Sequence, residues 1–316
     1  MSRIVVASPH RYPDLARLWY HSVARGLVPA LRQTGLETEV VLFRDAHVGE
    51  FDPAHFPGAL LEAPGPGVRD FLEFYDAALC YDADYLFLLD ADLFFLDPEW
   101  PSRWLPSFED PEVSAVSFLR RTDQPGVYAL LCRVEHYRAL PRPAFAPAYE
   151  NLDDARNTVN RQPGDVAARR LRSQGRKILL AEPAEAEERI ADFHGTTVIR
   201  ASREVFGHLM NGHGFEGLVS RKRYFAMGAY DNALLGALYQ ALFDEPFAPG
   251  SNAEALGGSV PVDLVRQELG RIDDPALRET LADYFDRSDR AILRLAEREG
   301  IALSLPPLRP DSWRRD

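Results

Sequence analysis

The chain has 316 residues, of which 46% are hydrophobic, and this length can bury a substantial core. Its formal net charge of −12 argues against nucleic acid or an anionic membrane surface as the main partner. The two cysteines, Cys80 and Cys132, have the spacing of neither a disulfide framework nor a zinc site, which favours a reducing cytoplasm. We also expect no transmembrane segment, because no apolar stretch is long enough to span a bilayer.

The first third of the chain alternates between strand and helix patterns. Strands are expected at residues 3–8, 38–43, 59–62 and 85–89, and helices at residues 14–34 and 68–80. The first strand is expected to end at Pro9, and the first helix at Gly35. The run 85–89 is continuously apolar, which is typical of a strand buried on both faces. This alternation predicts an α/β fold with a mostly parallel, doubly wound sheet.

The pattern changes after residue 110. Further strands are expected at 113–119, 127–134 and 190–199, and further helices at 165–172, 202–210 and 231–243. Residues 141–176 are polar and proline-containing, so we expect an insertion over one end of the sheet. Residues 261–299 predict amphipathic helices that form a cap or a homodimer contact. We therefore divide the chain into a main domain, 1–245, and a helical C-terminal extension, 246–316.

The most informative segment is Asp90-Ala91-Asp92, directly after the buried strand. In open α/β sheets, ligands bind beyond the carboxyl ends of the parallel strands, which is where these acids are expected. On an extended chain, residues two apart point to one face with Cα atoms about 6.6 Å apart, so both carboxylates can reach one cation. Ala91 is small and keeps the approach open. Asp90 and Asp92 are therefore the expected ligands of Mn²⁺ or Mg²⁺, with a diphosphate completing the oxygen shell.

An isolated Asp-x-Asp is more often a pair of ordinary carboxylates at the end of a strand, because short motifs match frequently by chance. Here an apolar run precedes the pair, and a second apolar run that ends in Asp97-Pro98 follows it. Two acids between buried segments repel one another and lose hydration unless a cation lies between them. This context favours the metal site over the ordinary pair.

The same residues resemble a known family. Residues 81–98 are similar to the metal-binding strand of the GT-A glycosyltransferases, most closely the glycogenin-like family 8 and its nucleotide-diphospho-sugar transferase relatives. Residues 191–206 are similar to the family's Phe-Asn-x-Gly strand, and residues 230–236 to its Asp-Gln-x-x-Leu-Asn helix start. The resemblance covers residues 1–245 and implies a Rossmann-like GT-A fold.

The resemblance implies a hexosyltransferase-like enzyme that moves a glycosyl unit from a nucleoside-diphosphate sugar to an acceptor hydroxyl. The acceptor is left open between a glycan, a small molecule and a peptide, and residues 141–176 would lie on its side. The donor-binding residues that the resemblance implies, besides Asp90, are Ala7, Ser8, His10, Arg11, Tyr12, Arg69 and Ala91. For Arg11 and Arg69, an exposed surface position is an equally good alternative to donor binding.

One departure from the family concerns the third metal ligand. The family takes this ligand from a late histidine, but no histidine follows His213 in this chain. His194, His213 and Asn252 are the alternatives. His194 also stands where the family has the asparagine of its strand, which puts the usual acceptor contacts in doubt. Since Asp192 and Gly195 flank it, we keep His194 as a catalytic candidate, beside the alternative of a structural histidine.

Asp231 begins an expected helix with an apolar face of leucines, and it has two alternative roles. As a helix cap, an aspartate contributes about 1 kcal/mol. As a catalytic residue, it would bind the acceptor hydroxyl or take its proton. A base at Asp231 would suit inversion of the anomeric configuration, whereas the family resemblance favours retention, and both stay open.

Two other functions compete with glycosyl transfer. A sugar nucleotidyltransferase normally needs a glycine-rich N-terminal loop to hold a triphosphate, and residues 8–12 contain no glycine. A non-catalytic nucleotide-sugar or carbohydrate-binding protein would keep the pocket and lose turnover. Consumption of a donor therefore separates this binding protein from the enzyme.

Overall fold

The structure is a computed structural model, and the fold is described for the part of the chain that it places. The described residues are 2–10, 12–44, 50–62, 73–91, 93–94, 100–121, 124–145, 164–181, 192–193, 196–197, 234–247, 275, 289–290 and 292–303.

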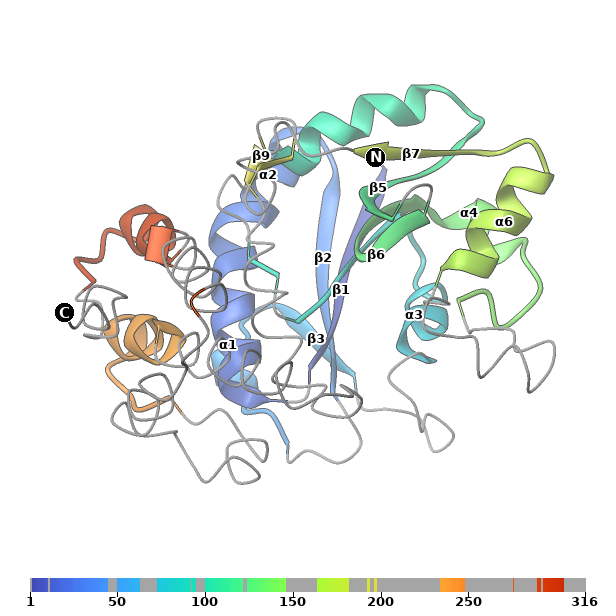
Figure 1. Ribbon diagram of the computed structural model, residues 1–316. Coiled ribbons are helices and arrows are strands. Elements are labelled where there is room, and N and C mark those ends of the chain that lie inside the picture. Colours follow the sequence, from blue (N-terminus) through green and yellow to red (C-terminus); the bar gives the residue numbers. More distant parts are fainter. Residues whose placement is uncertain are drawn as a thin grey trace.

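A seven-stranded sheet forms the centre of the described structure, in the order β3-β2-β1-β4-β6-β5-β7 (Figure 1). Only β6 runs antiparallel to its neighbours; the other pairs are parallel. The expected mostly parallel α/β sheet is therefore confirmed. The strands are β1 (Arg3–His10), β2 (Glu37–Arg44), β3 (Ala59–Glu62), β4 (Tyr85–Leu89), β5 (Val113–Arg121), β6 (Gln124–Arg133) and β7 (Lys177–Ala181).

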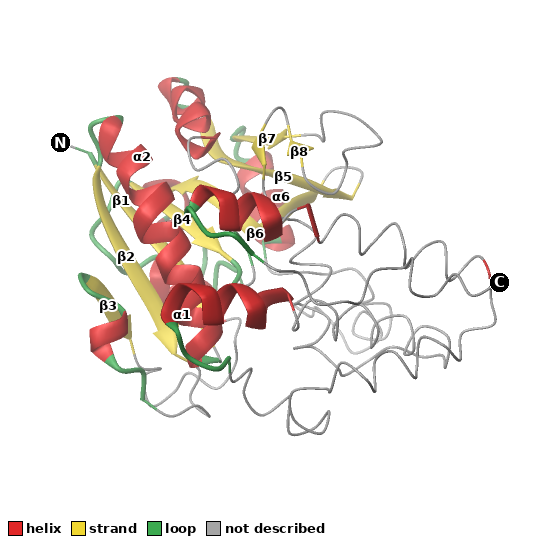
Figure 2. Cartoon of the chain, turned by 90° about the vertical axis from the view of Figure 1, so that its left-hand side faces the viewer, coloured by secondary structure: helices red, strands yellow, loops and turns green. Residues whose placement is uncertain are grey.

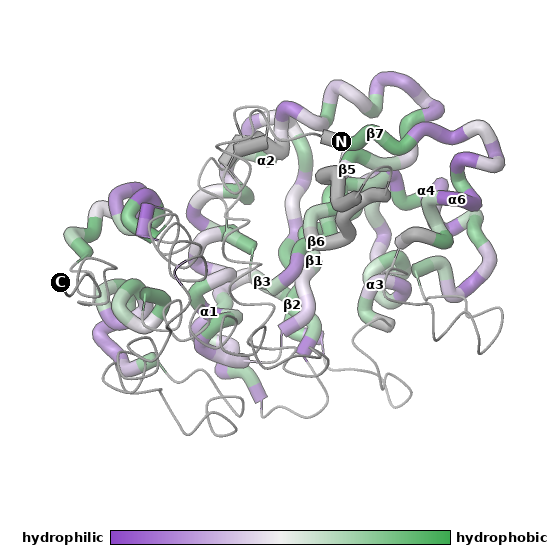
Figure 3. The backbone as a smooth tube through the Cα atoms, in the orientation of Figure 1, coloured by the Kyte–Doolittle hydropathy of each residue, from purple (hydrophilic) through white to green (hydrophobic). Residues whose placement is uncertain are grey.

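Helices cover both faces of this sheet, as a doubly wound fold requires (Figures 1 and 2). One face is covered by α1 (Pro13–Ser22), a π-helical turn (Val23–Leu27), α2 (Val28–Gln33), the 3₁₀ helix Trp100–Glu109 and the helical residues 234–243 and 292–298. The opposite face is covered by α3 (Glu73–Ala78), α4 (Val134–Arg138) and α6 (Asp165–Ser173). Hydrophobic residues accordingly concentrate on the central strands, whereas α6 is largely hydrophilic (Figure 3).

Alternate residues of β1 belong to the two separate cores. Ile4 and Val6 pack with α1 and α2, whereas Val5 and Ala7 pack with α3. This division follows from strand geometry, because successive side chains of a strand point to opposite faces. The parity of a residue on β1 or β4 therefore decides which face its side chain reaches.

The first helical region matches the expected span, with one irregular turn. Pro29 has no N–H to bond the carbonyl of Arg25, and its ring crowds that carbonyl, which accounts for the wider π-helical turn at Val23–Leu27. Gly35 has a φ of 85°, a backbone conformation that favours glycine, and it follows the end of the helix as expected.

Strand β1 is longer than expected, because it continues through Pro9 to His10. The expectation that Pro9 ends the strand is wrong. Strand β4 pairs with β1 only as far as Ala7, so beyond this point β1 has a neighbour only in β2. Proline is tolerated at such an edge, since it has no N–H to donate to a second neighbour.

Several short elements also differ from the expectations. The five-residue helix α4 and the five-residue strand β7 were not expected, because α4 follows β6 with no turn signal between them and β7 directly follows the polar residues 141–176. Instead of one strand at 190–199, the described residues form an antiparallel pair, β8 (Asp192–Phe193) and β9 (Thr196–Thr197). Gly195 lies between the two and is a turn signal in the sequence.

The expected helix at 165–172 is present as α6, and it packs on the sheet beside α4. Residues 146–163, the middle of the expected insertion, lie outside the described residues, as does the expected helix at 202–210. No helix among the described residues has both the length and the apolar character needed to cross a bilayer.

The helix at 292–298 is anchored to α1 by a cluster of charges around Glu299. The Glu299 carboxylate lies 3.1 Å from His21 Nε2 and 3.2 Å from Arg25 Nη1, and it accepts a 2.9 Å hydrogen bond from Arg298. The side chain of Glu299 is only 5% exposed. Burial alone would raise the pKa of Glu299, but the hydrogen bonds from His21 and Arg298 and their charges outweigh it and lower the pKa to about 2.

Glu299→Gln is expected to lower the free energy of unfolding by about 2 kcal/mol near neutral pH, because charged hydrogen bonds are lost inside the cluster. A carboxylate with a lowered pKa stabilises the fold fully above its unfolded pKa, 4.5, and loses this contribution as the pH falls through about 2. The gap between the two proteins should therefore narrow in denaturant melts at about pH 3.5 compared with about pH 7. Glu297→Gln, at an exposed residue of the same helix, is the control; an equal loss there would contradict the role of the cluster.

Candidate active site

The chain reverses its direction of strand addition between β1 and β4. It proceeds from β1 outward to β2 and β3, and then returns to place β4 on the other side of β1. The connections agree with this reversal, since α1 and α2 join β1 to β2 on one face and α3 joins β3 to β4 on the other. In open α/β sheets, the crevice beyond the carboxyl ends of such strands is where ligands bind.

The acidic motif lies at this reversal. Ala7 of β1 pairs with Leu88 of β4, and Asp90 follows the end of β4 directly. After Asp90 the chain turns, because the N–H of Leu93 donates to the carbonyl of Asp90 at 3.2 Å. Leu93 and Phe94 then return to the core on the α1 face. Asp90 and the buried Ala91 thus lie in a turn between two buried segments.

The turn is a feature that the sequence did not predict. The spacing of about 6.6 Å between Asp90 and Asp92 assumed an extended chain, and a turn closed between Asp90 and Leu93 is not extended. Aspartate is favoured at the first position of such turns, because its side chain bonds nearby backbone groups. Asp92 itself lies outside the described residues.

The Asp90 carboxylate is half-buried and has a tyrosine partner. The hydroxyl of Tyr75, on α3, donates a 3.3 Å hydrogen bond to Asp90 Oδ1. Leu86 and Leu88 belong to the core on the α3 face, and Asp90 shares their parity, so its contact with α3 follows from the strand. Carboxylate oxygens are the ligands that hard divalent cations prefer, so the chemistry of this group fits Mn²⁺ or Mg²⁺.

Ser8 and His10, at the carboxyl end of β1, are both fully enclosed. The exposed fraction is 0% for Ser8 and 1% for His10. Neither the Ser8 hydroxyl nor either ring nitrogen of His10 has a hydrogen-bond partner among the described residues. The His10 ring packs edge-on against Trp19 of α1 at 4.9 Å.

Burial determines the charge of His10. Desolvation of the imidazolium lowers the pKa of His10 to about 3. The ring is therefore neutral near pH 7 and cannot attract a phosphate by charge. It can donate one hydrogen bond and accept another, so the unpartnered nitrogens fit a neutral polar group better than a diphosphate.

The two strand ends bring the predicted residues to one edge of the sheet, but on opposite faces. Ser8 and His10 share the parity of Ile4 and Val6 and so point to the α1 face, whereas Asp90 contacts α3. Ala7 is buried on the α3 face and Tyr12 is buried at the start of α1.

The helix at 234–243 docks on α1. Arg17 of α1 donates to the hydroxyl of Tyr239 at 3.1 Å and to Glu245 at 2.7 Å, and its guanidinium lies 4.0 Å from the centre of the Phe243 ring. Tyr239 in turn donates to Asp14 at 3.2 Å. The leucines expected on its apolar face, Leu234, Leu235 and Leu238, are buried, and Leu242 is half-buried.

Several predicted residues lie outside the described part of the chain. They are Arg11, Arg69, Asp92, His194, His213, Asp231 and Asn252. Among the described residues no group of three or more His, Cys, Asp or Glu side chains is arranged to hold a metal ion, and that set does not include Asp92. Of the predicted metal site, the structure therefore describes only Asp90, with its neighbours Ala91 and Tyr75.

Tyr75 was not predicted from the sequence. It lies in an amphipathic segment in which an aromatic residue is most simply a core residue, and 15 positions separate it from Asp90. The only signal in the sequence was that the expected helix at 68–80 directly precedes the strand that ends at Asp90. This order does not show whether Tyr75 or Phe74 contacts Asp90.

No protein-family model matches the sequence, and no curated protein matches it. Solved structures do show similarity. A mannosyltransferase from Pyrobaculum calidifontis in complex with GDP-Man and Mn²⁺ is 12% identical, with a TM-score of 0.44, over 95% of this chain and 76% of that one. The catalytic domain of Drosophila β1,4-galactosyltransferase 7 is 14% identical, with a TM-score of 0.35, over 63% of this chain and 71% of that one.

A third structure, S. aureus TarS 1–349, is 9% identical, with a TM-score of 0.36, over 98% of both chains. The first two of these structures are described as glycosyltransferases. The narrower resemblance to family 8 stays a prediction. Since all three TM-scores are 0.44 or lower, the similarity carries nothing about the donor, the acceptor or the metal.

Proposed function

We propose that this chain transfers a glycosyl unit from a nucleoside-diphosphate sugar to an acceptor hydroxyl, with a divalent cation held by Asp90 and Asp92. The observation that carries the proposal is the position of Asp90. It is a half-buried carboxylate at the carboxyl end of β4, next to β1, at the point where the strand order reverses. This is where an α/β sheet binds ligands, and the acid there has the ligand chemistry for a cation.

Each part of the proposed site has a separate task. The turn at Asp90–Leu93 presents carboxylate oxygens beyond the sheet, and the buried Leu93 and Phe94 hold that turn in place. Mn²⁺ or Mg²⁺, when bound, supplies positive charge against the charge that develops on the departing nucleoside diphosphate. The Ser8 hydroxyl and the neutral His10 ring are enclosed in this structure, and they would offer hydrogen bonds to an uncharged part of the donor, such as the base or the ribose, if the donor displaces the groups that cover them.

The remaining predicted residues extend the proposal. Ala7, Tyr12 and Ala91 would form the wall of the donor site, and Arg11 and Arg69 would face the donor phosphates. His194, His213 or Asn252 would complete the metal ligands. Residues 141–176 would face the acceptor, and a reducing cytoplasm remains the expected compartment.

The test is the response of the full chain to nucleoside diphosphates with and without Mn²⁺. The melting temperature should rise with one diphosphate only when Mn²⁺ is present, because the cation links the two. A screen of donors by mass spectrometry should then find release of the matching nucleoside diphosphate. Stabilisation without any donor consumption would support the non-catalytic binding protein, and no metal-dependent stabilisation by any diphosphate would refute both.

Asp231→Asn is expected to lower kcat about a hundredfold and to change the donor affinity little, because a general base acts on the acceptor. The helix at 234–243 should still dock on α1 through Arg17 and Tyr239, so the melting temperature should change little. Measured kcat and donor Kd provide the comparison. Equal losses in both, together with a lower melting temperature, would indicate that Asp231 is only a helix cap.

A further inference from the structure

We propose that Tyr75 is a positioning residue that fixes the orientation of the Asp90 carboxylate toward the cation. This inference rests on the proposed function, since it concerns the same metal site. The hydroxyl of Tyr75 donates to Asp90 Oδ1 at 3.3 Å. A hydrogen bond to one oxygen of a carboxylate restricts rotation of the group, and therefore the directions in which its remaining lone pairs point.

Tyr75 is held rigidly enough to act as a fixed point. Its side chain is 2% exposed. The ring centre lies 4.0 Å from that of Phe74 and 5.5 Å from that of Phe145. A large ring packed between such neighbours has one available rotamer, so the hydroxyl stays at one place beside Asp90.

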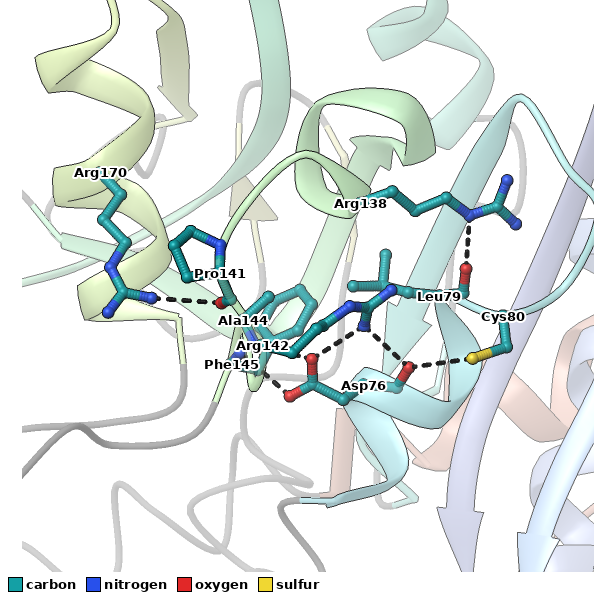
Figure 4. A network of polar contacts seen from close by, with 9 residues as sticks. All are labelled: Asp76, Leu79, Cys80, Arg138, Pro141, Arg142, Ala144, Phe145 and Arg170. Carbon is teal, nitrogen blue, oxygen red and sulfur yellow. Dashed lines mark hydrogen bonds and ion pairs between the residues drawn. The ribbon is translucent and has the colours of Figure 1, made fainter.

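Phe145, the clamp that packs against Tyr75, is anchored to Asp76, the next residue of α3. The backbone N–H groups of Ala144 and Phe145 donate to the Asp76 carboxylate at 2.7 and 3.2 Å, and Arg142 adds a 3.0 Å contact (Figure 4). Phe145 is fully buried and cannot turn away. Helix α3 thus makes two contacts that matter here. Its Tyr75 binds Asp90, and its Asp76 binds the backbone of Phe145, whose ring packs against Tyr75.

Without this hydrogen bond, the half-buried Asp90 carboxylate would be held less firmly in the orientation that the cation needs. Loss of such an outer hydrogen bond typically costs about 10- to 100-fold in metal affinity. The cost falls on binding of the cation rather than on the maximal rate, because the ligands are complete once the cation is bound.

The experiment compares Tyr75→Phe with Tyr137→Phe in the full chain. Tyr137 is 1% exposed and stacks on the same Phe145 ring at 5.1 Å. Tyr137→Phe therefore removes an equivalent hydroxyl from the same aromatic cluster. Binding of Mn²⁺ alone is measured by electron paramagnetic resonance of the free ion. The Mn²⁺ Kd should rise about tenfold in Tyr75→Phe and stay within about twofold in Tyr137→Phe.

A kinetic measurement separates positioning from general damage. In Tyr75→Phe the Mn²⁺ concentration for half-maximal turnover should rise by the same factor as Kd, while the rate at saturating Mn²⁺ returns close to that of the wild type. Phe145→Leu, which loosens the clamp and keeps the Tyr75 hydroxyl, is the second variant, with an expected rise of about threefold in Kd.

Each outcome is decisive. Wild-type Mn²⁺ affinity in Tyr75→Phe, or an equal loss in Tyr137→Phe, would overturn the positioning role and leave the proposed function standing. A Tyr75→Phe protein that does not fold moves the decision to Phe145→Leu, where an unchanged Kd would overturn the role. A wild-type chain that binds Mn²⁺ neither alone nor with any nucleoside diphosphate would overturn the proposed metal site and this inference together.

Discussion

Asp90→Asn is expected to lower metal-dependent turnover about a thousandfold and to leave the fold intact. The amide keeps an oxygen that can accept the Tyr75 hydrogen bond but loses the negative charge that attracts a cation. Charge stabilisation by a bound cation is worth several kcal/mol in the transition state, and about 4 kcal/mol corresponds to about a thousandfold in rate. Turnover is measured as donor consumption at increasing Mn²⁺ concentrations, and the melting temperature checks the fold.

Asp82→Asn is the matched control for this prediction. Asp82 is exposed and lies near the amino end of β4. Asp82→Asn is therefore the same substitution at the opposite end of the strand from Asp90. Its turnover should equal that of the wild type. Full activity of Asp90→Asn at the Mn²⁺ concentration that saturates the wild type would contradict the metal site.

Asp76→Ala should give the largest loss of stability, about 3 kcal/mol in the free energy of unfolding. The Asp76 carboxylate accepts the backbone N–H groups of Ala144 and Phe145, and both of these residues are fully buried (Figure 4). Removing the acceptor leaves both amides without a partner, and each buried unpaired group costs about 1–3 kcal/mol. Urea unfolding followed by circular dichroism measures the loss.

Arg142→Ala separates the backbone hydrogen bonds from the ion pair. Arg142 also contacts Asp76, at 3.0 Å, but its side chain is 41% exposed, and an exposed ion pair contributes at most about 1 kcal/mol. Arg142→Ala should therefore lower stability by less than half as much as Asp76→Ala. Equal losses would assign the stabilisation to the ion pair.

The sequence predicted the fold best where the apolar pattern was strongest. Strands β3 and β4 have the expected bounds, because apolar runs with turn signals on both sides leave one assignment. Strand β7 and helix α4 were missed, because α4 follows β6 with no turn signal between them and β7 directly follows the polar residues 141–176. Strand β1 continues past Pro9 because β4 stops pairing with it at Ala7. This depends on how the strands pair in the folded protein, which the local sequence does not show.

Of the candidate site, the sequence predicted the position of Asp90 but not the local geometry around it. The sequence placed Asp90 at the carboxyl end of a buried strand, and the structure has it there. It did not predict the turn that follows, because Asp-Ala-Asp is compatible with both extended and turned backbone. Nor did it predict Tyr75, whose contact with Asp90 depends on how α3 packs against the sheet.

The anchoring of residues 292–299 also bears on how the protein can be divided for experiments. Ile292, Leu295 and Ala296 belong to the same apolar core as α1, and Arg298 donates to Ser22 as well as to Glu299. A fragment that stopped at residue 245 would expose this face of α1 to water, and His21 would lose its contact with Glu299. The main domain predicted from the sequence, residues 1–245, lacks these contacts, and a fragment that includes residues 292–299 would keep α1, and the strand β1 beneath it, in place.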